Sequence, residues 1–255
     1  MKTLEAVPYV PGASDDRLLD VFLPDAERFP VLVYFHGGGI EAGTRRDLAL
    51  VPHLVERGVA VVSADYRMYP HAVYPEFIRD AAAAVAWVHN NLGAYGADGR
   101  LFVGGSSAGS YLSQMLCFDK KYLVPHGLDP DSFAGFIHDA GQPTVHFNVL
   151  RERGIDARRV MVDEAAPLYH VTENPSYPPM LFLVSDHDMP GRFEQIQLMY
   201  ATLREMGNDM SKIHLRLMEN SRHCEYVEKK DARGNSIFGA ILYDFIASQT
   251  AERNG

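Results

Sequence analysis

Short runs of β-branched and aromatic residues alternate along this chain with longer segments whose apolar residues recur at helical spacing. The runs "VLVYF" at 31–35 and "VAVVSA" at 59–64 are typical of buried strands, and they enclose a helical-period segment at 48–55 that ends before Gly58. Strands that alternate with helices indicate a mostly parallel central sheet covered by helices. The sequence therefore predicts an α/β fold.

The same alternation continues to the end of the chain. Two opening antiparallel strands are expected at 4–10 and 18–23, and further strands at 100–104, 133–139, 180–185 and 213–218. Helices are expected at 76–92, after 105, at 192–206 and at 236–249. No repeat or linker interrupts the pattern, so residues 1–255 are predicted to form a single domain, with 120–179 as a small cap or insertion.

Composition narrows the class of partner. The 24 basic and 33 acidic side chains give a net charge of −9, which disfavours nucleic acid and anionic membranes, so a small-molecule ligand is expected. The N-terminus has no signal-peptide core and no segment is long and apolar enough to span a membrane, which predicts a cytoplasmic protein. Cys117 and Cys224 have no CxxC spacing, and neither a disulfide framework nor a zinc site is indicated.

The pentapeptide "GSSAG" at 105–109 matches G-x-S-x-G and lies between a predicted strand and a predicted helix. That context is typical of a nucleophile elbow, a turn too tight for side chains at its flanking glycines. The turn would expose the Ser107 hydroxyl and place the Ala108 amide at a helix N-terminus, where it can stabilise an oxyanion. A turn without a chemical role is the alternative reading.

A second glycine-rich loop, "HGGGI" at 36–40, follows the strand at 31–35. In α/β-hydrolases this loop supplies the remaining oxyanion-hole amides, and Gly38 and Gly39 are the predicted donors. A phosphate cradle is disfavoured because the dinucleotide spacing and the Walker lysine are missing. We expect His36 to hold the loop by hydrogen bonding rather than to act as a base.

A general base and its orienting acid are expected downstream of the serine. Asp186 and Asp188 follow the strand at 180–185, and His223 follows the last strand, so both positions lie at the carboxyl edge of the sheet. Asp139, at the end of an earlier strand, is a third candidate acid. Ligand spacing for a metal ion is not found, so no metal or cofactor is expected.

In this order the motifs resemble the hormone-sensitive-lipase-like carboxylesterases of the α/β-hydrolase superfamily. The segment "VVSADYRMYP" is similar to that group's DYR…P stretch, and the resemblance extends from about residue 31 to 226. It implies the α/β-hydrolase fold, with helices on both sheet faces, and hydrolysis of esters by Ser107, His223 and Asp188. The spacing of Asp188 from Pro178-Pro179 matches the family's acid position.

The sequence departs from the family pattern at several points. Ser185 stands where the acid motif usually has glycine, and Asn220 and Glu225 replace the residues that commonly flank the histidine. Only 35 residues precede His36, so the family's N-terminal cap helices are expected to be missing. A shallow pocket follows, walled by 120–179 or by the second subunit of a homodimer. Such a pocket favours short acyl groups on bulky alcohols, with acetylated carbohydrates as one instance.

Two other functions remain open at this point, because a fold does not determine a function. An arylformamidase or related amidase would share the fold and triad, although its HGGxW loop is not met because Ile40 follows the glycines. A non-catalytic binding protein with this fold is the second alternative, and the presence of all three triad candidates disfavours it.

Overall fold

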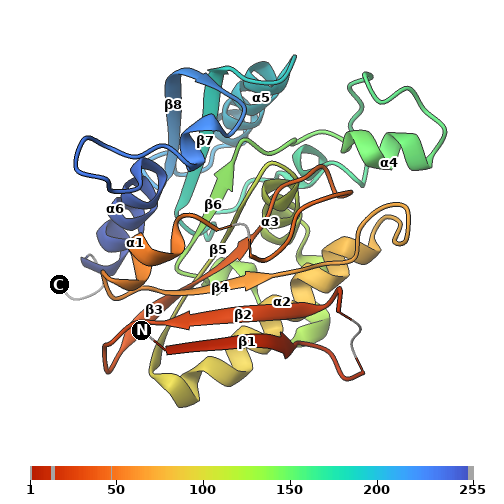
Figure 1. Cartoon of the computed structure of the whole chain (residues 1–255). Helices are drawn as coiled ribbons and strands as arrows, with labels where there is room; N and C mark the ends of the chain where they lie inside the picture. The colour runs from red at the N-terminus through yellow and green to blue at the C-terminus, as the bar shows by residue number, and fades with distance from the viewer. Residues whose placement is uncertain (1, 13–14, 47, 252–255) are drawn as a thin grey trace.

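A central sheet of eight strands runs through the computed structural model, which describes residues 2–12, 15–46 and 48–251 (Figure 1). The strands follow the order β1-β2-β4-β3-β5-β6-β7-β8, and all are parallel from β4 to β8, whereas β1 and β2 are antiparallel. The strands are β1 (Lys2–Pro8), β2 (Leu18–Leu23), β3 (Phe29–Phe35), β4 (Ala60–Ala64), β5 (Ala97–Ser106), β6 (Gly135–Asp139), β7 (Met180–His187) and β8 (Ile213–Arg222).

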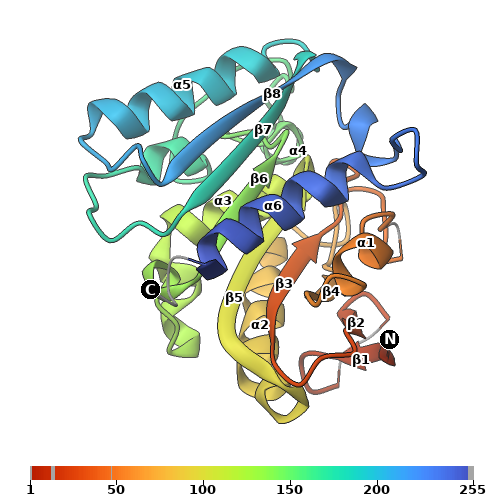
Figure 2. The ribbon, with the colours of Figure 1, turned by 90° about the vertical axis from the view of Figure 1, so that its left-hand side faces the viewer.

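Helices cover both faces of the sheet. They are α1 (Val51–Val55), α2 (Glu76–Asn91), α3 (Ala108–Phe118), α4 (Phe147–Glu152), α5 (Arg192–Glu205) and α6 (Ile237–Ala251). The core on one face contains residues of α1 and α6, whereas α2, α3 and α5 contribute to the core on the other, an arrangement that Figure 2 shows from the α6 side. The shorter 3₁₀ helices are η1 (Leu92–Tyr95), η2 (Lys120–Tyr122), η3 (Val124–His126), η4 (Pro130–Ser132), η5 (Pro167–His170) and η6 (Glu225–Val227).

Burial on both faces explains why the central strands read as unbroken apolar runs. Leu32 and Tyr34 of β3 pack into the core beneath α1 and α6, whereas Val33 and Phe35 pack into the core beneath α2, α3 and α5. Successive side chains of a strand point to opposite faces, so a strand covered on both sides carries apolar residues throughout. The predicted mostly parallel α/β fold is confirmed.

The predicted insertion at 120–179 needs a correction. β6 lies inside this range and pairs with β5 on one side and β7 on the other, near the middle of the sheet. Only the part after β6 forms an excursion between two strands, and it carries α4 and η5 (Figure 1). Pro, Asp and Gly around a short strand concealed its central place, because their turns are found both in insertions and in ordinary connections.

Six segments meet at one edge of the sheet. The six strands from β4 to β8 in the sheet order are parallel, so the segments after their carboxyl ends share that edge. These segments include the glycine loop at 36–39, the turn at Ser107, and the positions of Asp188 and His223.

Among the described residues, no helix is long and apolar enough to cross a membrane.

Candidate active site

Ser107 lies in the sharp turn between β5 and α3. Its φ angle is +52°, a positive value that is strained for serine, and strain of this kind is often found at functional sites. The flanking glycines are required by contact distances: a Cβ on Gly109 would lie 2.0 Å from the Phe35 carbonyl oxygen, and one on Gly105 would lie 2.4 Å from Gly109. The G-x-S-x-G spacing is therefore demanded by the close approach of backbone around the turn.

Ser107 and two residues from distant loops form a hydrogen-bonded chain. His223 Nε2 lies 2.8 Å from Ser107 Oγ, and His223 Nδ1 lies 2.6 Å from Asp188 Oδ1. The Asp188 side chain is fully buried, and the Met189 amide donates to it at 2.7 Å. A carboxylate held on Nδ1–H leaves Nε2 free to accept the serine proton.

The strand before His223 is longer than predicted. β8 continues to Arg222 instead of ending near 218, and it pairs with His187 of β7 past an irregularity in the register. Ser185 and Glu225, two of the residues that depart from the family pattern, bind the end of β8. Ser185 Oγ donates to the Arg222 carbonyl at 2.7 Å, and the Arg222 amide donates to the Glu225 carboxylate at 2.9 Å. Both bonds hold the backbone directly before His223.

Asp186, in β7, contacts the end of β8 rather than the histidine at 223. It accepts hydrogen bonds from the amides of Asn220, at 2.8 Å, and Ser221, at 3.1 Å, and it contacts His187 Nδ1 at 2.8 Å. The backbone bond from Asn220 is the largest of the effects that lower the pKa of Asp186 to about 2. Asp186 therefore joins the ends of β7 and β8, just before Asp188 and His223.

Asp139 lies in a buried polar cluster beneath the nucleophile turn. Ser106 and Tyr226 donate hydrogen bonds to its two carboxylate oxygens, and the Tyr34 hydroxyl lies 2.6 Å from Ser106 Oγ. The Asp139 carbonyl accepts the Ser107 amide at 2.8 Å. Sequence reasoning missed Tyr34 and Tyr226, because a tyrosine in an apolar strand or a loop is usually packed for its ring.

Burial raises the pKa of Asp139 to about 6, from 3.8. The pKa of Asp139 is higher in the folded protein than in the unfolded chain. The contribution of Asp139 to the free energy of unfolding is therefore complete below about pH 4 and is lost as the pH rises through about 6. We expect the wild type to lose roughly 3 kcal/mol of unfolding free energy over this pH range and Asp139→Asn not to lose it, because asparagine does not titrate. Urea unfolding of both proteins between about pH 3.5 and 7.5 measures this loss, and parallel pH curves of the two proteins would contradict it.

The backbone of the glycine loop at 36–39 is fixed by close contacts within the loop region and by a hydrogen bond from α4. Gly38 and Gly39 have φ angles of +105° and +70°, and a Cβ on Gly38 would lie 2.0 Å from the Ala42 carbonyl oxygen. The Asn148 side-chain amide donates to the Gly39 carbonyl. No local sequence signal marks Asn148, which stands 109 residues further along the chain.

His36 lies beneath this loop. The His36 ring stacks on the Tyr66 ring with 4.5 Å between centroids, and His36 Nδ1 lies 2.7 Å from the Gly37 carbonyl oxygen. The Tyr66 hydroxyl donates a hydrogen bond to the His36 carbonyl oxygen at 2.9 Å. Tyr66 belongs to the DYR segment, and its neighbour Asp65 forms an ion pair with buried Arg45. These contacts connect the DYR segment to the position of the glycine loop.

A cleft of about 650 Å³ opens above Ser107. Apolar side chains in its wall are those of Leu48, Phe147, Met189 and Val227, and the carboxylates of Glu41, Glu225 and Glu228 also line it. The amide-bearing loops at 37–39 and 106–107 belong to the same wall. Among the residues that the structure describes, no group of three or more His, Cys, Asp or Glu side chains is placed to hold a metal ion.

Curated relatives share parts of this sequence. The chain is 31% identical over 221 residues to esterase LipC of Mycobacterium tuberculosis, a match that covers 77% of this chain and 54% of that protein. It is 42% identical over 96 residues to esterase LipI of the same organism, covering 36% of this chain and 30% of that one. This chain therefore spans only about half the length of LipC, and the match to LipI covers a smaller share still.

Solved structures share the fold over nearly the whole chain. A truncated carbohydrate esterase from gut microbiota superposes with a TM-score of 0.81 at 17% identity, covering 98% of this chain and 97% of that one. Esterase B from Lactobacillus rhamnosis superposes with a TM-score of 0.79 at 16% identity, covering 99% of this chain and 87% of that one. The family described as BD-FAE matches residues 19–147, which are 129 of 255 residues. The chain therefore belongs to the BD-FAE family, within the hormone-sensitive-lipase-like α/β-hydrolases.

Proposed function

We propose that this chain is a serine carboxylesterase that hydrolyses short-chain acyl esters through an acyl-enzyme. The observation that carries the proposal is the position of His223, which bridges Ser107 Oγ at 2.8 Å and Asp188 Oδ1 at 2.6 Å. Nucleophile, base and orienting acid within hydrogen-bond reach are the arrangement that activates a serine. The names of the relatives, two of them called esterases, support the same reaction class.

In this mechanism the Ser107 oxygen attacks the ester carbonyl while His223 Nε2 takes the hydroxyl proton. Asp188 keeps the second imidazole proton on Nδ1 and stabilises the imidazolium. The amides of Gly38, Gly39 and Ala108 receive the oxyanion, His223 then protonates the departing alcohol, and water hydrolyses the acyl-enzyme by the reverse proton path. The side chains needed for each proton transfer belong to this chain.

The cleft supports a short acyl group and a polar alcohol. The cleft is open to solvent on one side, whereas enclosing a long acyl chain needs a closed apolar tunnel. Three glutamates line the same cleft and provide hydrogen-bond acceptors for hydroxyl groups. Acetylated carbohydrates are therefore the proposed substrate class, and a solved structure called a carbohydrate esterase has the same fold.

We expect kcat/KM to fall with acyl length, by about tenfold or more from acetate to octanoate, because extra methylenes find little apolar surface to cover. Hydrolysis of 4-nitrophenyl esters from acetate to decanoate measures this trend. Acetylated xylo-oligosaccharides and N-formyl arylamines in the same panel test the alcohol and the amidase alternative. An equal or greater kcat/KM on decanoate would contradict the short-acyl proposal, and faster hydrolysis of the formylamines would favour an arylformamidase.

A further inference from the structure

A second cavity of about 440 Å³ adjoins the catalytic cleft. The two share three lining residues, Glu41, Phe147 and Met189, so the side chains of Phe147 and Met189 separate one space from the other. The cavity is formed by the excursion after β6 and by the start of α5, which belong to different parts of the chain. A ligand that extends from Ser107 across Phe147 and Met189 enters this second space.

Positive charge is concentrated in the wall of this cavity. Its charged lining residues are four arginines and a single glutamate, namely Arg151, Arg158, Arg159, Arg192 and Glu41. The whole chain carries a net charge of −9, so this local excess of cations is opposite in sign to the protein's average. A cavity lined by one sign of charge attracts small ligands of the other sign.

Arg192 places a buried guanidinium in this wall. The residue is only 4% exposed, and its guanidinium donates to the Ala140 carbonyl and, at 3.4 Å, to the side-chain oxygen of Gln142. Both acceptors are neutral, and no carboxylate within the described ranges forms an ion pair with this residue. Burial lowers the pKa of Arg192 below its ordinary value, and the charge of Asp188, which acts in the opposite direction, does not offset this cost.

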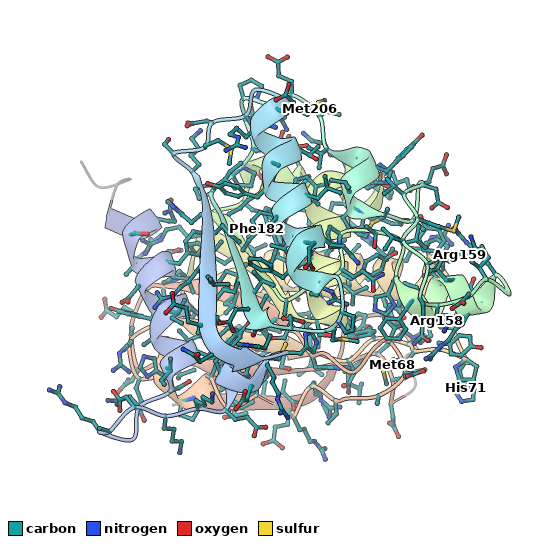
Figure 3. The ribbon with its side chains drawn as sticks, turned by 90° about the horizontal axis from the view of Figure 1, so that it is seen from above. Met68, His71, Arg158, Arg159, Phe182 and Met206 are labelled. Atoms are coloured by element: carbon teal, nitrogen blue, oxygen red, sulfur yellow. The ribbon has the colours of Figure 1, made fainter. Side chains whose placement is uncertain are left out.

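The exposed arginines differ in the partners they already have. Arg151 lies 3.0 Å from Glu41, and Arg158 lies 2.6 Å from Asp156. The side chain of Arg159 forms no ion pair in the part of the chain that the structure describes. Figure 3 shows Arg158 and Arg159 at the outer side of the excursion after α4, on the side of the molecule where Met68 and His71 also lie. Arg159 is therefore the exposed cation of this cavity that is available to a ligand.

We propose that this second cavity binds a carboxylate on the alcohol part of the ester substrate. The proposal rests on the proposed esterase function, because the substrate is positioned by its carbonyl at Ser107. A short acyl group cannot cross Phe147 and Met189, so the group that reaches the arginines belongs to the alcohol. Guanidinium groups bind carboxylates through two parallel hydrogen bonds, and the apolar side chains between the two spaces suit a ring or an aryl spacer. An ester of a sugar acid or of a hydroxy-aryl acid combines these features.

The test compares two acetates that differ in charge, 3-carboxyphenyl acetate and 3-carbamoylphenyl acetate. We expect Arg159→Gln to lower the ratio of kcat/KM for the anionic over the neutral ester by about 3- to 10-fold, and Arg159→Lys to retain most of it. Arg153→Gln is the matched control, because Arg153 is on the same segment, forms an ion pair with Asp163 at 2.6 Å and does not line the cavity. High salt should reduce the ratio of the wild type and leave that of Arg159→Gln nearly unchanged.

A binding measurement separates this proposal from the proposed function. Affinity for 3-hydroxybenzoate, the expected product, is measured by calorimetry in the Ser107→Ala background with and without Arg159→Gln. If Arg159→Gln weakens binding of 3-hydroxybenzoate several-fold and Arg153→Gln does not, the carboxylate site is supported. This holds even if neither acetate is hydrolysed, a result that would reject the proposed esterase function and leave the carboxylate site standing. Equal effects of Arg159→Gln and Arg153→Gln on both the ratio and the affinity would overturn the carboxylate site.

Discussion

Replacing Ser107 with alanine is expected to lower kcat on aryl acetates by about 10⁴-fold or more. The substitution removes the oxygen that His223 Nε2 contacts at 2.8 Å, so no acyl-enzyme can form. The backbone amides of Gly38, Gly39 and Ala108 remain, and they account for the residual rate. The measurement is hydrolysis of 4-nitrophenyl acetate by both proteins, with circular dichroism to verify the fold.

Ser106→Ala is the matched control for this prediction, since the adjacent serine donates its hydroxyl to Asp139, whereas the hydroxyl within hydrogen-bond distance of His223 Nε2 is that of Ser107. A fluorophosphonate should label the Ser106→Ala protein and leave Ser107→Ala unlabelled, because it reacts with an activated serine oxygen. An inactive Ser106→Ala beside a nearly normal Ser107→Ala would move the nucleophile to the earlier serine.

Asp188→Asn is expected to lower kcat by roughly 10³- to 10⁴-fold with the fold retained. The carboxylate oxygen lies 2.6 Å from His223 Nδ1, and an amide at this position can present its own N–H to the ring. Nδ1 would then become the acceptor and Nε2 would carry the proton, which is the wrong tautomer for deprotonating Ser107. An asparagine also leaves the imidazolium without a counter-charge. Steady-state kinetics on aryl acetates measure the loss.

Two further aspartates provide controls for the acid. Asp186→Asn and Asp139→Asn should each lower kcat much less, because Asp186 accepts backbone amides at the end of β8, and Asp139 accepts hydrogen bonds from Ser106 and Tyr226. Asp139→Asn also carries the pH-dependent stability change given above, so its kinetics are compared at a pH where both proteins are folded. A mild Asp188→Asn variant beside an inactive Asp139→Asn variant would assign the acid to β6.

Element order and the nucleophile turn were predictable from sequence because both depend on local rules. A strand buried on both faces must be apolar at successive positions, as in β3. At Gly109 any Cβ would lie 2.0 Å from a backbone oxygen, so the turn admits only glycine there. The ends of β8 and the central place of β6 were not predictable, since they depend on pairing with strands that are remote in the chain.

The sequence by itself determined the alternating fold and the short list of candidate groups, because hydrophobic period and glycine spacing are local properties of the chain. The family resemblance assigned the acid to Asp188, but only the tertiary structure decided the contacts: Asp186, still within β7, accepts backbone amides of β8, whereas Asp188, just past the end of β7, contacts the His223 ring. The same holds for the contact of Asn148 with Gly39 and for the cavity at Arg159. Such contacts join residues whose distance is a property of the folded chain, and no local pattern encodes it.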